Sequence, residues 1–279
     1  MALSTFLDGL GFAESPRWHA NRLWFSDMDR RWVFASDLAN PPEEICFVSG
    51  RPSGLGWLPD GRMLVVSMDD RLLLRLDESG LTKVAELGSL ATFHCNDMVV
   101  DRKGRAYVGN FGFDYASGAE LVGTVLIRVD PDGTISSVAD DLLFPNGMAI
   151  SPDGKTLTVA ESFGSRVSAY TVDPDGGLHH RRTFAKFAEV GDRSGSPDGM
   201  CLDAEGAAWV AVKNHVLRVR EGGDVLEDIE TQPGWNAVAC MLGGADRRTL
   251  FVTTSTKHDA GRTARIETMY VDVPGAGLP

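Results

Sequence analysis

The sequence predicts an all-β protein, a six-bladed β-propeller with four-stranded antiparallel blades around a central channel. One pattern recurs six times in 279 residues: an apolar strand, a tight turn and a second alternating strand. Further strand-like runs, such as RLLLRLDESG and TVLIRVDPDG, lie between the copies. Helical periodicity is absent over any long stretch. Two hairpins in each unit of roughly 40–50 residues make a four-stranded blade, and six such units close into a ring.

The turns support this assignment copy by copy. The six copies span residues 14–28, 53–67, 96–110, 146–162, 198–212 and 237–255. The middle four place glycines 43, 50 and 52 residues apart at equivalent turn positions, Gly61, Gly104, Gly154 and Gly206. Glycine supplies the positive φ that a tight hairpin needs. The first and last copies lack the aligned glycine and match less well.

The two ends of the chain are expected to close the ring. The run RIETMYVDV (265–273) and the segment Thr5–Leu10 are both strand-like, and we expect them to complete the same last blade. Closure removes open sheet edges, which otherwise invite aggregation. No linker or shift in composition marks a second domain, so residues 1–279 are expected to form a single propeller.

Composition and charge limit the classes of partner. Apolar residues make up 43% and charged residues 24%, as in an ordinary globular protein. The formal net charge is −12, from 27 basic and 39 acidic residues, and no basic cluster is present. Nucleic acid and an anionic membrane surface are therefore not expected as partners. The simplest interpretation of the acidity is solubility. The oligomeric state is not predicted.

The lack of a visible secretory signal and the scattered cysteines predict a cytoplasmic protein. The start, MALSTFLDGLGFAESPRW, has neither the basic nor the long apolar region of a secretory signal. No apolar run approaches the roughly 18 residues of a membrane span. The cysteines are scattered and lack zinc-like spacing, at Cys46, Cys95, Cys201 and Cys240. Buried free thiols are the economical interpretation, with a disulfide left open.

Polar residues stand where the innermost strands begin. Five of the six copies open on such a residue: Glu14, Ser53, Asn96, Asn146 and Asp198. A single Asn-Gly or Asp-Gly is ordinarily just a turn. However, Glu14, Asn146 and Asp198 occupy equivalent positions in separate blades, so the channel should bring them together. Two carboxylates and one amide suit a hard cation such as Ca²⁺, Mg²⁺ or Mn²⁺.

Four segments resemble the family of senescence marker protein (regucalcin), gluconolactonase and luciferin-regenerating enzyme. They are GFAESPRW, CNDMVVDRKGRAYVGN, FPNGMAISPDGKTLTVAES and SPDGMCLDAEGAAWVAV. The resemblance implies one divalent metal ion, with Ca²⁺ expected first and Mn²⁺, Mg²⁺, Zn²⁺ or Fe²⁺ as alternatives. Its ligands would be Glu14, Asn146 and Asp198. Asn96 would reach the substrate or the outer shell of the metal, and Glu120 lies in a loop that contacts substrate in relatives. The implied activity is hydrolysis of a small lactone.

The chain departs from the family beside Asn96. Sugar-lactone members commonly carry an arginine two residues before this asparagine, where it grips substrate hydroxyls, whereas this chain has His94. Histidine offers at most two nitrogens and titrates near neutrality. The following segment, NFGFDYASGAELVG, contributes Phe111, Phe113 and Tyr115. The substrate is therefore predicted to be a sugar lactone or a more apolar lactone.

The predicted mechanism assigns roles to a few side chains. A bound cation would polarise the lactone carbonyl, and Asp198, or else Asp97, would deprotonate the attacking water. His94 would orient substrate or donate a proton to the departing alkoxide. The simpler interpretations are a turn-capping Asp97 and a channel-lining His94. Cys95 beside His94 is interpreted as a small buried residue rather than a nucleophile.

Other residues are interpreted more plainly. Asn236, beside Trp235, is a further candidate to face the channel, and Glu161 is interpreted as structural. No serine-hydrolase GxSxG elbow and no phosphate-binding loop is present.

Three other functions are alternatives to a lactonase. A metal-dependent phosphotriesterase-like hydrolase could use the same site. A non-catalytic propeller that binds a ligand or protein would not need Glu14, Asn146 and Asp198 together. A condensing enzyme of the strictosidine synthase kind lacks this set of residues, so their presence counts against it.

Overall fold

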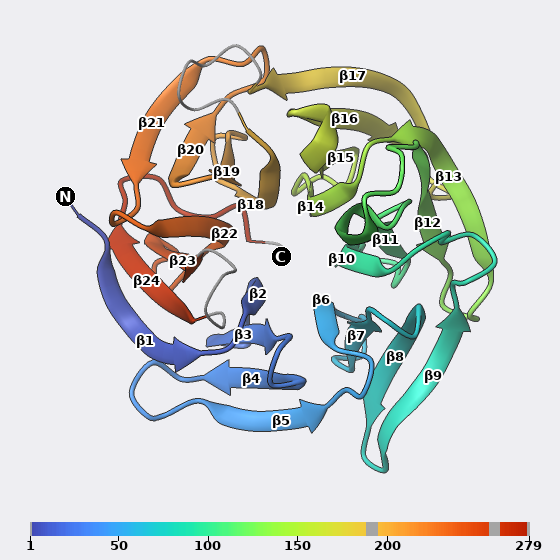
Figure 1. Cartoon of the computed structure of the whole chain (residues 1–279), viewed down its shortest axis with the longest axis horizontal. Helices are drawn as coiled ribbons and strands as arrows, with labels where there is room; N and C mark the ends of the chain where they lie inside the picture. The colour runs from blue at the N-terminus through green and yellow to red at the C-terminus, as the bar shows by residue number, and fades with distance from the viewer. Residues whose placement is uncertain (1, 188–194, 257–262, 278–279) are drawn as a thin grey trace.

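The chain folds into six four-stranded antiparallel sheets arranged around a central axis, as the computed structural model shows (Figure 1). The structure describes residues 2–187, 195–256 and 263–277. The predicted six-bladed β-propeller is confirmed. Each of the six repeats supplies the two inner strands of one blade.

Blades 1 to 3 follow one another along the chain, each running from its innermost to its outermost strand. Blade 1 contains β2 (Ala13–His19), β3 (Arg22–Asp27), β4 (Trp32–Ser36) and β5 (Glu43–Phe47). Blade 2 contains β6 (Pro52–Trp57), β7 (Met63–Ser67), β8 (Leu72–Asp77) and β9 (Gly80–Glu86). Blade 3 contains β10 (Cys95–Val100), β11 (Ala106–Asn110), β12 (Thr124–Val129) and β13 (Ile135–Leu142).

Blades 4 to 6 repeat this order. Blade 4 contains β14 (Pro145–Ile150), β15 (Thr156–Glu161), β16 (Arg166–Val172) and β17 (Leu178–Lys186). Blade 5 contains β18 (Pro197–Leu202), β19 (Ala208–Val212), β20 (His215–Val219) and β21 (Val225–Glu230). Blade 6 contains β22 (Trp235–Gly243), β23 (Thr249–Thr256), β24 (Ala264–Tyr270) and β1 (Ser4–Leu10).

Both chain ends close the ring, as predicted. Strand β1 pairs antiparallel with β24, with Ser4 opposite Thr268 and Leu10 opposite Ala264. The segment after β24 then crosses to blade 5, where the Ala276 amide donates to the Leu202 carbonyl at 3.0 Å. The last blade is therefore built from both ends of the chain.

The hairpin turns explain which repeats match well. Gly61, Gly104, Gly154 and Gly206 all have φ between 73° and 88°, the left-handed region that favours glycine. Blade 1 turns instead through Ala20 (φ 49°) and Asn21 (φ 59°). Two consecutive left-handed residues match a tight I′ hairpin, in which Asn is well tolerated. The first repeat therefore needs no glycine at the aligned position.

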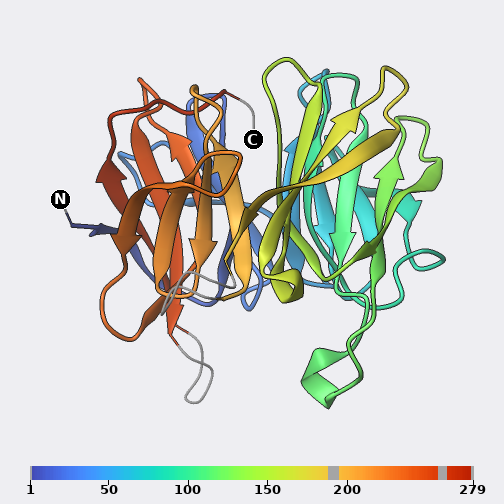
Figure 2. The same ribbon diagram turned by 90° about the horizontal axis from the view of Figure 1, so that it is seen from above.

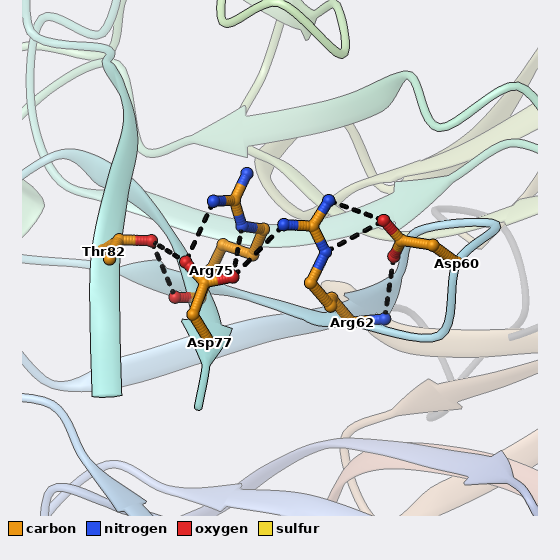
Figure 3. A network of polar contacts seen from close by, with 5 residues as sticks. All are labelled: Asp60, Arg62, Arg75, Asp77 and Thr82. Carbon is orange, nitrogen blue, oxygen red and sulfur yellow. Dashed lines mark hydrogen bonds and ion pairs between the residues drawn. The ribbon is translucent and has the colours of Figure 1, made fainter. Parts of the chain in front are cut away.

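A charged network reinforces the turn end of blade 2 (Figure 3). Arg62 donates to Asp60 at 2.5 Å and to Asp77 at 3.2 Å. Arg75 and Thr82 donate to the same Asp77 carboxylate at 2.8 Å and 2.5 Å. Hydrogen bonds from Arg75 and then Thr82 hold the pKa of Asp77 well below its usual range. The network therefore joins β8 and β9 to the β6–β7 turn. This turn follows the last residue of β6, whereas Ser53 lies near the start of that strand.

Helical structure among the described residues is limited to two short 3₁₀ turns, η1 (Tyr115–Ser117) and η2 (Ser162–Gly164). The η1 turn caps a loop that projects from one end of the ring, while the segment that follows β24 lies at the other end (Figure 2). Across the described ranges, no helix has the length and apolar character needed to cross a membrane.

Candidate metal and substrate site

The innermost strand of every blade is irregular near its start. Antiparallel register shifts occur between Glu14 and Arg17, Pro52 and Leu55, Cys95 and Met98, Pro145 and Met148, Pro197 and Met200, and Ala237 and Ala239. A β-bulge bends a strand and redirects a side chain without breaking the sheet. In five blades this irregular stretch contains or begins at a polar residue near the start of the innermost strand. These five are called the axial ring: Glu14, Ser53, Asn96, Asn146 and Asp198.

Glycine follows three axial residues because neighbouring inner strands approach closely. A Cβ atom on Gly54 would lie 2.4 Å from the Met98 nitrogen, and one on Gly147 would lie 2.5 Å from the Asp198 carbonyl oxygen. A Cβ atom on Gly199 would lie 2.1 Å from that of Ala239. None of the three has the left-handed φ of a turn glycine, and all lie within strands. The ordinary turn interpretation of these Asn-Gly and Asp-Gly pairs is therefore wrong.

One cavity of about 370 Å³ is lined by side chains from blades 1 to 5. Glu14, Asn96, Asn146 and Asp198 all line it, from blades 1, 3, 4 and 5. The three predicted metal ligands are thus in one cavity. Within the described ranges no three His, Cys, Asp or Glu side chains form a cluster able to hold a metal, so the candidate centre depends on two carboxylates with an amide.

The two carboxylates are electrostatically unfavourable together. Burial, then the negative charges of Asp198 and Asp97, raise the pKa of Glu14 well above its ordinary 4.5. Burial and Asp97 raise the pKa of Asp198 to about 7. The buried Oδ1 of Asp198 accepts no hydrogen bond from any part of the chain that the structure describes. A divalent cation would neutralise both charges and satisfy this oxygen, so the donor set fits a hard metal ion.

The two asparagines are held in different ways. Asn146 donates from Nδ2 to Ser162 Oγ at 3.2 Å, and Ser162 donates to the Pro197 carbonyl at 2.8 Å. This leaves the Asn146 carbonyl oxygen available to a cation. Asn96 instead accepts at Oδ1 from Ser53 Oγ at 3.2 Å, which leaves its Nδ2 group available to donate to a ligand. The geometry suits Asn146 to a metal and Asn96 to a substrate.

Asp97 lies beside the axial ring but does not line the cavity. Its Oδ1 accepts from Arg17 Nη2 at 2.6 Å, Ser15 Oγ at 2.9 Å and the Met98 amide at 2.8 Å. Arg17 also donates to the carbonyls of Leu55, Pro16 and Met98. Asp97 therefore acts as a buried anchor between blades, and it is less well placed than Asp198 to reach a substrate.

His94 lines the cavity at its rim. Its Nδ1 lies 3.5 Å from Asp69 Oδ1, and Arg51 holds the same carboxylate through Nε at 2.8 Å and Nη2 at 2.5 Å. Burial lowers the pKa of His94 below its ordinary 6.5, against the raising effect of Asp69. The neutral imidazole therefore dominates at pH 7, which favours orienting substrate over donating a proton.

Neighbouring candidates have clear positions. Cys95 is buried, and burial raises the pKa of its thiol to about 12, which leaves no thiolate for nucleophilic attack. All four cysteines are free and buried. Glu161 is buried and accepts from Arg166 and Arg181 at 2.8 Å and 2.7 Å, so its structural interpretation is confirmed.

Two further predicted positions lie away from this cavity. Glu120 is exposed in the loop between β11 and β12 and does not line it. Asn236 lines an adjoining cavity of about 900 Å³ that also contains Trp235 and Asp198.

Several residues that line the cavity were not predicted as site residues, notably Phe12, Arg51, Phe93 and Phe144. Phe12, Arg51 and Phe144 stand two residues before Glu14, Ser53 and Asn146, the same offset as His94 before Asn96. Aligning the repeats at this offset would have identified three of the four.

Comparison with known proteins shows the family of the chain. A family model described as the SMP-30/Gluconolactonase/LRE-like region matches residues 12–256. The chain belongs to this family.

Three relatives illustrate the range of the family. The pentonolactonase XacC of Haloferax volcanii is 26% identical over 94% of this chain and 88% of that protein. Regucalcin of Danio rerio is 32% identical, but the match spans only 63% of this chain and 59% of the relative. The structure of a luciferin-regenerating enzyme superposes with a TM-score of 0.82 at 19% identity, covering 97% and 96% of the two chains, and so shows the shared fold.

Proposed function

We propose that this protein is a divalent-metal-dependent lactonase. The observation that carries the proposal is the pair Glu14 and Asp198. Both face one cavity with raised pKa values, beside the Asn146 amide and an Asp198 oxygen that accepts no hydrogen bond from the described residues. The likeness to a pentonolactonase over nearly the whole chain supports the reaction class.

Glu14, Asn146 and Asp198 would hold the cation. Their oxygen donors favour Ca²⁺, with Mn²⁺ and Mg²⁺ as the other hard ions. A divalent cation there supplies Lewis acidity to a carbonyl oxygen and favours the charge that develops on attack.

Residues of the chain then bind and orient the lactone and transfer a proton. Asn96 donates from Nδ2 to the bound lactone, and neutral His94 orients it from the rim. Asp198 accepts a proton from the attacking water. The water oxygen bonds to the carbonyl carbon, the ring C–O bond breaks, and the ring oxygen takes up the proton that Asp198 accepted. The product is the open hydroxy acid.

A pH-indicator assay over a lactone panel tests the proposal. We expect turnover to disappear in EDTA and to return with added Ca²⁺, Mn²⁺ or Mg²⁺. We expect Asp198→Asn to lower kcat/KM at least about 10³-fold while circular dichroism stays unchanged. Asp153→Asn, at the exposed turn of blade 4, is the matched control and should keep full activity.

Two results would overturn it: full turnover after metal removal, or an unchanged rate in Asp198→Asn. Adding an organophosphate triester to the panel tests the phosphotriesterase alternative. Preferential hydrolysis of that ester would replace the lactonase assignment.

A further inference from the structure

A second ring of side chains lies next to the axial ring. In four blades the residue two positions before the axial residue lines the same cavity. These four residues are called the outer ring: Phe12, Arg51, His94 and Phe144. These four residues come immediately before the innermost strands β2, β6, β10 and β14, and blades 1, 3 and 4 each offer the cavity both an axial residue and an outer residue. The outer ring is therefore positioned to contact the part of a ligand that extends away from the axis.

Aromatic side chains form one wall of this outer zone, called the aromatic wall: Phe93, Phe111, Tyr115 and Phe144. Phe111 stacks on Phe144 with ring centroids 4.3 Å apart and an interplanar angle of 27°. Tyr115 contacts both rings at 5.8 Å and 5.9 Å, and Phe93 contacts Phe111 at 6.1 Å. All four line the cavity. Only the Tyr115 hydroxyl offers a hydrogen bond from a side chain of this wall.

The backbone holds Phe144 in this wall. Its φ is 61°, a left-handed conformation that bulky residues rarely adopt. Hydrogen bonds fix the segment, because the Leu143 amide donates to Glu161 at 3.1 Å and the Ser162 amide donates to the Phe144 carbonyl at 3.1 Å. Strained residues persist where the surrounding structure enforces them, and they cluster at ligand sites.

The polar residues of the outer ring leave the aromatic wall itself apolar. Arg51 is ion-paired with Asp69, so the two together add no net charge at the rim. The ring centroid of neutral His94 lies 4.1 Å from that of Phe93 and 5.7 Å from that of Phe111. Asp114 also lines the cavity, and its carboxylate accepts from the Ser117 amide at 3.2 Å. The cavity therefore has hydrogen-bonding groups at the axis, a carboxylate at Asp114 and ring carbons over the rest of the wall.

This division favours one class of substrate. A polyhydroxylated lactone would place hydroxyl groups against the aromatic wall and lose their bonds to water without replacement. A flat apolar substituent would instead gain free energy from burial there. The carbonyl end would still face Glu14, Asn146 and Asp198.

We infer that the substrate is a lactone bearing a flat apolar substituent, such as an aryl group, which packs on Phe111 and Phe144. Phe111 and Phe144 are then the specificity-determining residues. This inference rests on the proposed lactonase function.

Three six-membered lactones test it: δ-phenyl-δ-valerolactone, unsubstituted δ-valerolactone and glucono-1,5-lactone. Each kcat/KM is divided by the rate of uncatalysed hydrolysis, which removes differences in intrinsic reactivity. We expect the phenyl lactone to exceed each of the others at least about 10-fold. Phe111→Ala and Phe144→Ala should lower its kcat/KM at least about 10-fold, mainly through KM, and change that of δ-valerolactone less than about 3-fold.

The controls separate the wall from general packing. Phe163→Ala removes a ring that contacts Phe144 at 5.3 Å but does not line the cavity, so it should leave the substrate preference unchanged. Phe111→Leu and Phe144→Leu keep apolar volume and serve where an alanine variant does not fold.

The possible failures are distinguishable. No turnover of any lactone would overturn the proposed function itself. A preference for glucono-1,5-lactone would overturn only the inference, and so would alanine variants that slow the phenyl lactone and δ-valerolactone equally.

Discussion

Arg17 and Asp97 form a buried ion pair of 2.6 Å between blades 1 and 3, beside the two carboxylates of the candidate metal site. Both side chains are at most 5% exposed. The guanidinium thus balances one of three neighbouring carboxylates, and a cation would balance the other two.

Removing this guanidinium should destabilise the fold strongly. We expect Arg17→Met to lower the free energy of unfolding by about 3–5 kcal/mol, because Asp97 is left as an unpaired buried charge. The double variant Arg17→Met/Asp97→Asn should recover part of that loss. Urea denaturation measures each value.

The control is an exposed pair of the same chemistry. Arg220 and Asp224 are 61% and 65% exposed, so Arg220→Met should change stability by less than about 1 kcal/mol. A similarly small effect of Arg17→Met would contradict a role for the buried pair.

Ser162 should tune metal affinity without touching the metal. It accepts from Asn146 and donates to the Pro197 carbonyl, which fixes the amide and joins blades 4 and 5. We expect Ser162→Ala to weaken metal binding about 10- to 100-fold, the usual effect of losing an orienting partner. Isothermal titration of the metal-free protein measures this. Ser151→Ala, at the far end of β14, should leave affinity unchanged, and equal affinities in all three proteins would remove the orienting role.

Glu161 should make stability depend on acid. Burial alone raises the pKa of Glu161, but hydrogen bonds from Arg166, Ser168 and Arg181 outweigh it, and the pKa lies below its ordinary 4.5. Because this pKa is lower in the folded protein, Glu161 is protonated in the unfolded chain before it is protonated in the folded protein as the pH falls. The contribution is therefore present above about pH 4.5 and is lost as the pH falls through the folded-state pKa.

The measurement is urea unfolding from pH 7 to pH 3, before and after Glu161→Gln. We expect the variant to be less stable at pH 7 and to lose less stability on acidification. An unchanged slope between pH 5 and pH 3 would exclude Glu161 as a source of the acid sensitivity.

Gly199 should resist any side chain because of blade packing. Its added Cβ would lie 2.1 Å from the Ala239 Cβ and 2.6 Å from the Ala239 Cα. We expect Gly199→Ala to cost at least about 1–3 kcal/mol, the usual penalty of overpacking. Gly88→Ala is the control, because its nearest neighbour is the flexible Arg71 guanidinium at 3.4 Å, and its effect should stay below about 1 kcal/mol. Thermal melting compares the two, and equal shifts would contradict the packing explanation.

Much of the architecture could be predicted because its signals are local. Alternating apolar residues and turn glycines such as Gly61 and Gly154 act within a few residues of each other, so the hairpins are visible in the sequence. Repetition then implies the ring, and equivalence between repeats brings Glu14, Asn146 and Asp198 to one axis. The Asn-Gly turn interpretation failed because the close approach that demands glycine comes from a different blade.

The sequence by itself determined the six blades, their closure by both chain ends and the axial ring, since each depends on local periodicity repeated along the chain. Only the tertiary structure decided that Asp97 is held by Arg17, that Glu120 lies outside the cavity and that Phe111 stacks on Phe144. These contacts join residues from different repeats or loops. Their geometry depends on how closely the blades pack and on where each inner strand bulges, and neither leaves a periodic trace in the sequence.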